Sequence, residues 1–127
     1  MKIVVLSCLV FSILLNQYQS SAQNNLITVA SVDPATAIIN HLKCRIQKDR
    51  VFLEWTIGNN QLVSQIEVES SADGKNYAMA GLVFSTEKKD SDAYYFYEKA
   101  RATKIFYRLK IIHKDQTIRY SDIVSPG

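Results

Sequence analysis

Residues 51–74 constrain the fold of this chain more than any other segment. Val51, Leu53, Trp55 and Ile57 alternate with residues expected to face outward, a period of two that is typical of a half-buried β-strand. Residues 62–70 repeat the alternation, and Asp73-Gly74 then gives a hairpin turn signal. Trp55 is the only tryptophan and is large enough to organise a small core.

The rest of the chain is divided in the same way. We expect further strands at residues 38–47, 77–85, 93–97, 104–112 and 117–124, separated by charged or polar turns. Short strands at roughly ten-residue spacing are typical of an all-β sandwich or barrel. We expect Ser64 and Ser70 to share an inward face with Ile66 and Val68. The predicted core consists of Leu53, Trp55, Ile66, Val68, Tyr107, Leu109 and Ile111.

The N-terminus has the pattern of a secretory signal. Lys2 precedes an apolar run at residues 3–15, which has the length of a signal-peptide core and is short for a membrane span. We predict a signal peptide at 1–22, an extended leader at 23–37 and a β-sandwich at 38–125. The mature chain would be secreted, periplasmic or at the cell surface, with no stable membrane span.

Cleavage after Ala22 would remove Cys8 and leave Cys44 as the one cysteine. A single cysteine cannot form an intramolecular disulfide, so the core must hold the exported fold. We expect Cys44 to act as a small buried hydrophobic residue.

Four segments, in this order and at suitable distances, point to a known family: VFLEWT (51–56), IEVESSADGK (66–75), FYRLK (106–110) and YSDIV (120–124). Together they resemble the fibronectin type III-like, immunoglobulin-fold modules of secreted and surface proteins of Gram-negative bacteria. The resemblance covers about residues 44–124 and implies a two-sheet antiparallel sandwich of about seven strands. It also implies a spacer role, often beside a C-terminal secretion sorting domain, and a tyrosine corner in which Tyr107 bonds back to the preceding loop.

The sequence shows no catalytic, metal or cofactor pattern. No serine lies in a Gly-x-Ser-x-Gly elbow, and Glu67 with Glu69 does not define a glycosidase cleft. His41 and His113 lack ligand-spaced partners, and we expect both at the surface. A formal charge of +3 is far from a nucleic-acid footprint. We therefore predict no enzyme, no cofactor and no nucleic-acid partner.

The resemblance allows two outward faces to be compared. If strand 62–70 lies antiparallel to strand 104–112, then Glu67 and Glu69 meet Arg108 and Lys110, either as structural pairs, which we favour, or as a charged ligand face. If Tyr94 and Phe96 point inward, the predicted ligand-binding residues share an exposed face: Phe52, Tyr95 and Tyr97.

Such an aromatic strip can stack sugar rings or dock a partner. The alternative is cross-strand packing, or cover by the leader or a neighbouring domain. The function predicted from the sequence is a non-catalytic structural or interaction module, either a spacer or a protein–protein contact domain. The second hypothesis is a carbohydrate-binding or adhesive module that uses the aromatic face. The expected partners are accordingly a protein or a cell-surface glycan.

Overall fold

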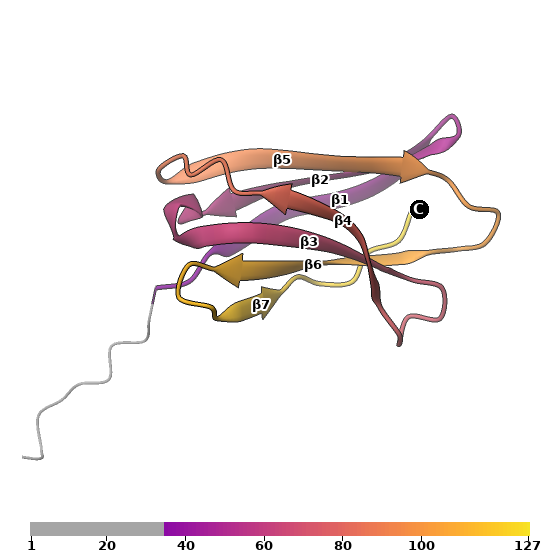
Figure 1. The fold of residues 1–127 in the computed structure, drawn as a ribbon. Coiled ribbons are helices and arrows are strands. Elements are labelled where there is room, and N and C mark those ends of the chain that lie inside the picture. Colours follow the sequence, from indigo (N-terminus) through magenta and orange to yellow (C-terminus); the bar gives the residue numbers. More distant parts are fainter. Residues whose placement is uncertain (1–34) are drawn as a thin grey trace, which may run out of the picture. The chain divides into compact units, whose positions relative to one another are not determined.

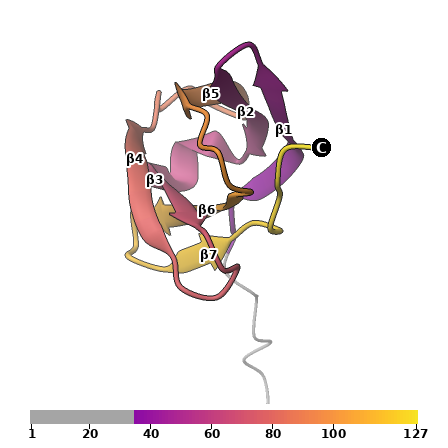
Figure 2. The same ribbon diagram turned by 90° about the vertical axis from the view of Figure 1, so that its right-hand side faces the viewer.

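The computed structural model describes residues 35–127, which form two antiparallel β-sheets packed face to face (Figures 1 and 2). The three-stranded sheet has the order β1-β2-β5, and the four-stranded sheet has the order β4-β3-β6-β7. An all-β sandwich is therefore confirmed. The strands are β1 (Ile38–Gln47), β2 (Arg50–Gly58), β3 (Val63–Ser71), β4 (Ala78–Phe84), β5 (Ser91–Lys99), β6 (Phe106–His113) and β7 (Ile118–Tyr120).

Each sheet combines hairpins with pairings between distant strands. The pairs β1-β2, β3-β4 and β6-β7 are hairpins, whereas β5 returns to β2 and β6 returns to β3. The chain therefore crosses between layers after β2, after β4 and after β5, as Figure 1 shows. Both strand pairings expected from the sequence are present, β3 with β6 and β2 with β5.

The core lies around the indole of Trp55, which is 2% exposed and stacks on Tyr94 with ring centroids 5.9 Å apart. The seven residues predicted for the core are all buried, since Leu53, Ile66, Val68, Tyr107, Leu109 and Ile111 are 0% exposed. Truncating a buried aromatic of this size typically costs about 3–5 kcal/mol.

Strand β3 departs from the predicted alternation at its start. Val63 is 0% exposed and Ser64 is exposed, so the expectation that Ser64 faces inward is wrong. The pairing with β6 shifts between Val63 and Gln65, where Ser64 is the extra residue of a β-bulge. A bulge inserts one unpaired residue and reverses the inward and outward positions on either side of it.

His113 is also placed differently from the prediction. It is 3% exposed rather than at the surface, because it continues the inward positions of β6 beyond Ile111. Its Nε2 accepts a hydrogen bond of 3.0 Å from the buried backbone N–H of Ala37. Its Nδ1 lies 3.0 Å from the carbonyl oxygen of Thr117, which it can satisfy as a donor.

The last two residues of the predicted leader, Thr36 and Ala37, are therefore attached to the sandwich. Besides the Ala37 contact, the carbonyl of Thr36 accepts a hydrogen bond from Asn59 Nδ2, and its hydroxyl accepts one from Arg119. The predicted signal peptide and residues 23–34 lie outside the described residues. Within residues 35–127, no helix has the length and apolarity to span a membrane.

Candidate functional site

The outward face of the β1-β2-β5 sheet carries the three aromatic residues singled out from the sequence. The register pairs Phe52 with Tyr97 and Glu54 with Tyr95, so these side chains share one side of the sheet. Tyr94 is 6% exposed and Phe96 packs against the core, which leaves the alternate residues of β5 facing outward. Tyr95 is 70% exposed and Tyr97 is 49% exposed.

Two arginines stack on this aromatic strip. The Phe52 and Tyr97 rings lie 5.8 Å apart between centroids. The guanidinium of Arg45 lies 5.2 Å from the Phe52 ring, and that of Arg50 lies 5.1 Å from the Tyr97 ring. A guanidinium over an aromatic face is attracted by the ring quadrupole. Arg45 also donates to Glu54 and Gln47, so the strip is a mixed aromatic and cationic surface.

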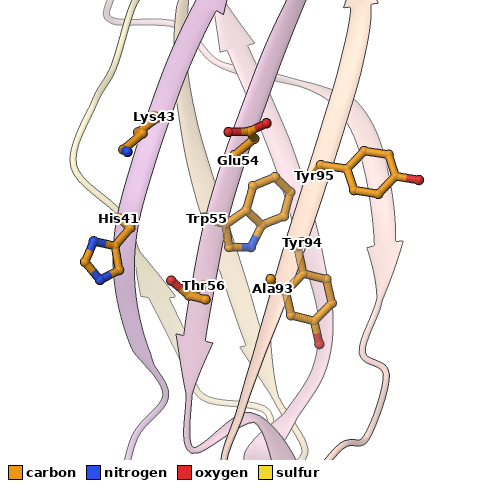
Figure 3. Close-up of a pocket in the computed structure, with 8 residues that line it drawn as sticks. All are labelled: His41, Lys43, Glu54, Trp55, Thr56, Ala93, Tyr94 and Tyr95. Carbon is orange, nitrogen blue, oxygen red and sulfur yellow. The ribbon is translucent and has the colours of Figure 1, made fainter.

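A shallow pocket of about 370 Å³ lies beside the strip. Figure 3 shows His41 and Lys43 on β1 at one side, Tyr95 on β5 at the other, and Glu54 and Thr56 of β2 between them. Ala93 contributes only a methyl group next to Thr56, its partner across the sheet, which leaves space between the larger side chains. The pocket therefore joins an apolar wall to several polar groups, the usual composition of a recognition site.

The same face holds an excess of positive charge. Among the residues that the register places outward, the acidic one is Glu54. Four are cationic, namely Lys43, Arg45, Arg50 and Lys99. Glu54 pairs with Arg45 at 2.9 Å. In the part of the chain that the structure describes, Lys43, Arg50 and Lys99 form no ion pair.

The outward face of the other sheet differs because its charges are paired with one another. Lys110 bonds Glu67 at 3.0 Å and Arg108 bonds Glu69 at 2.6 Å, as expected for opposite charges across β3 and β6. The Glu67 hydrogen bond raises the pKa of Lys110. Arg108 also lies 4.1 Å from the Tyr77 ring and 4.4 Å from the Tyr120 ring. Its cation is thus already enclosed by Glu69 and these two rings.

Tyr107 makes a different contact from the one implied by the resemblance. Its hydroxyl donates to the carboxylate of Glu98, near the end of β5, at 2.5 Å. Burial first, and then this bond, raise the pKa of Tyr107 above its usual range. The hydroxyl therefore joins β6 to the end of a strand in the opposite sheet, and the acceptor is a side chain.

Sequence reasoning missed one buried polar cluster, which closes the end of the sandwich near the β2–β3 connection. Asn60 is 0% exposed, starts the 3-10 turn Asn60–Leu62 and accepts a hydrogen bond from the Tyr94 hydroxyl. Its amide nitrogen donates to Thr86 Oγ1 and to the Lys88 carbonyl. The strand pattern does not indicate this cluster, because the partners of Asn60 are 26 or more residues away along the chain.

The remaining candidates for chemistry are a metal site and the Cys44 thiol. Among residues 35–127 there is no group of three or more His, Cys, Asp or Glu side chains that could hold a metal ion. Cys44 is half-buried against the core, and burial raises the pKa of its thiol to about 11. A thiol with so high a pKa is a poor nucleophile at neutral pH.

Comparisons with known proteins found a solved structure with a similar fold but no matching family. No family model matches the chain, and no curated protein matches it. Among solved structures, the chain is similar to pectate lyase PelI from Erwinia chrysanthemi, determined in complex with tetragalacturonic acid. The two are 14% identical with a TM-score of 0.53, over 72% of this chain and 28% of PelI. The match thus spans under a third of PelI, and at this identity it supports the fold alone.

Proposed function

We propose that the chain is an exported, non-catalytic interaction module of the fibronectin type III-like kind, and that it contacts its partner through the outward face of the β1-β2-β5 sheet. The observation that carries the proposal is the strip formed by the half-buried Phe52 and the exposed Tyr95 and Tyr97, with Arg45 and Arg50 stacked on two of its rings. Large exposed aromatic patches on soluble domains usually mark contact surfaces.

The strand order supports the fibronectin-like assignment within the sandwich class. β4 pairs with β3, whereas in the constant-type immunoglobulin arrangement the fourth strand joins the sheet of the fifth. The four sequence segments that carry the resemblance lie on β2, on β3 and its following turn, on β6, and on β7 with its extension to Val124. A spacer in a longer surface protein fits the same assignment.

The contact face can be tested by placing a photo-crosslinking phenylalanine at position 95 in the organism that encodes the chain. Phe84, which is 70% exposed on β4 in the other sheet, provides the matched control position. The proposal expects a covalent adduct from position 95 and none from position 84. Adducts from position 84 alone, or from neither position, would contradict it.

Export needs its own measurement because the N-terminal signal lies outside the described residues. We expect the mature protein outside the cytoplasm, with Gln23 as its first residue after cleavage behind Ala22. N-terminal sequencing of the fractionated protein checks this, and a full-length product in the cytoplasm would refute export.

A carbohydrate-binding or adhesive module is the second candidate. The favouring observation is the high exposure of Tyr95 and Tyr97 beside the shallow pocket, since flat exposed rings can stack sugars. Binding to a glycan array that is undiminished in the Tyr95→Ala, Tyr97→Ala variant would remove this assignment.

A further inference from the structure

We propose that the outward face of the β1-β2-β5 sheet binds an acidic polysaccharide, a chain of sugar residues bearing carboxylates. This inference rests on the contact face proposed above and adds the chemical class of its ligand. It follows from two features of that face taken together, the arrangement of its tyrosines and the excess of its positive charge.

The tyrosines are arranged to meet a repeating ligand of flat rings. Tyr95 and Tyr97 are two residues apart on the same side of β5, which spaces them by roughly 7 Å along the strand. Both are exposed, and the Tyr97 ring contacts Phe52, its cross-strand partner on β2. A linear chain lying along β5 can therefore stack one ring on Tyr95 and place the next ring beside Tyr97, whose face Arg50 covers.

The cations are placed to receive carboxylates from the same ligand. Arg50 lies over the Tyr97 ring at 5.1 Å, and Lys99 is the cross-strand partner of Arg50. A sugar ring near Tyr97 would thus present its carboxylate to a guanidinium, which suits planar two-point recognition of that group. Glu54 lies between Tyr95 on β5 and Lys43 on β1. Lys43 therefore provides a further cation at the pocket.

The contrast with the other sheet strengthens the charge argument. There, Glu67 pairs with Lys110 and Glu69 with Arg108, so an incoming anion would have to break existing bonds. On the β1-β2-β5 face, the carboxylate of Glu54 is already occupied by Arg45, and the other described cations of the face remain unpaired. Uncompensated positive charge attracts an anionic partner and speeds its association.

The test measures binding of hexasaccharides by calorimetry to the purified mature chain. The acidic probes are hexamers of galacturonate, mannuronate and hyaluronate, and the neutral probes are their uncharged or esterified counterparts. Poly-L-glutamate serves as an acidic chain without sugar rings. We expect at least one acidic hexamer to bind about tenfold more tightly than its neutral counterpart, and more weakly as salt is raised.

Four variants separate the contributions to binding. Arg50→Gln and the Tyr95→Ala, Tyr97→Ala pair should each weaken binding of the acidic hexamer by about tenfold. Lys75→Gln and Phe84→Ala remove an exposed cation and an exposed aromatic elsewhere, and should leave binding unchanged. Unchanged far-ultraviolet circular dichroism shows that each variant is folded.

The possible outcomes test separately whether the ligand is an acidic polysaccharide and whether the β1-β2-β5 face is the contact surface. Equal binding of acidic and neutral hexamers, or equal binding of poly-L-glutamate, overturns the acidic polysaccharide. If such binding still depends on Tyr95 and Tyr97, the contact face stands without this ligand. Failure of all three acidic hexamers to bind overturns the inference outright. Binding that neither tyrosine nor Arg50 affects overturns the inference and the proposed face together.

Discussion

Gly81 lies where β4 of one sheet approaches β5 of the other. A Cβ at this position would overlap Cε2 of the Phe96 ring, closer than real Cβ contacts allow. Phe96 is itself packed against the core, so its ring has little freedom to move aside. The absence of a side chain at residue 81 is therefore what lets the two sheets close at this edge.

Gly81→Ala should destabilise the fold by about 1–3 kcal/mol, the usual cost of forcing extra atoms into a packed core. Gly58→Ala is the matched control, since its Cβ would meet nothing closer than 3.5 Å. Urea denaturation checks both variants. Equal stability of the two would contradict the packing of Phe96 against residue 81, and partial rescue by Phe96→Leu would support it.

Asp73 holds the turn after β3 through its carboxylate. Backbone N–H groups of Asn76 and Lys75 donate to Oδ1 at 2.8 and 2.9 Å, and Ser71 adds a further hydrogen bond. These bonds, that from the Asn76 backbone first, hold the pKa of Asp73 well below its usual range. A carboxyl with a lowered folded pKa contributes stability above its unfolded pKa and loses it as pH falls through the folded value.

The stability of the wild type should therefore fall between about pH 5 and pH 2, and Asp73→Asn should show a smaller fall. Asp92 and Asp115 also have lowered pKa values, so part of the pH dependence remains in the variant. Denaturation midpoints measured across this pH range check the prediction, with Asp90→Asn as the control. An identical pH dependence in Asp73→Asn and the wild type would refute it.

At the residue level, strand periodicity predicted which side chains of β2 and β6 are buried. It also contained the signal for His113, which occupies the next inward position after Ile111. The expectation of a surface histidine relied on residue type and missed this position. Asn60 could not have been found in this way, because its burial depends on bonds to residues far along the chain.

Strand β6 contributes to both the core and the charged outer face of its sheet. Its inward residues include Tyr107, Leu109 and Ile111, and its outward Arg108 is enclosed by Tyr77, Tyr120 and Glu69. The sequence predicted the pairing of Arg108 with an acid. It did not predict the two flanking rings, which come from the loop before β4 and from β7.

Arg108→Lys should destabilise the protein by about 1 kcal/mol although the charge is kept, because an ammonium cannot stack on both rings or use the planar guanidinium geometry. Thermal unfolding measures the loss. Arg45→Lys is the control on the other sheet, where the side chain is half exposed and an effect within about 0.5 kcal/mol is expected. A larger loss from Arg45→Lys than from Arg108→Lys would contradict the enclosed site.

The ends of the elements were the least predictable from the sequence. β7 covers only Ile118–Tyr120, and beyond it the predicted strand continues as an isolated bridge between Tyr107 and Val124. Ser121 interrupts the ladder, because its hydroxyl accepts the backbone N–H of Leu109. Local pattern cannot anticipate a side chain that replaces a ladder bond.

In residues 35–127 as a whole, alternation and turn signals predicted an all-β sandwich or barrel. The two-sheet arrangement within that class came from the family resemblance. The sequence also placed Phe52, Tyr95 and Tyr97 on one face, which follows once β2 and β5 are paired. It did not single out Arg45 or Arg50 for that face. Their stacking on the rings depends on cross-strand register, although the outward positions of both could have been read from the alternation.

The central claim is that the two sheets close over Trp55 and so divide β5 into a buried and an exposed side. Tyrosine nitration with mass-spectrometric mapping tests it directly, because neighbouring residues of one strand should react differently. We expect fast modification of Tyr95, which is 70% exposed, and protection of Tyr94 and Tyr107, which are 6% and 0% exposed. Modification of Tyr94 and Tyr107 as fast as that of Tyr95 would contradict the core and, with it, the proposed contact face.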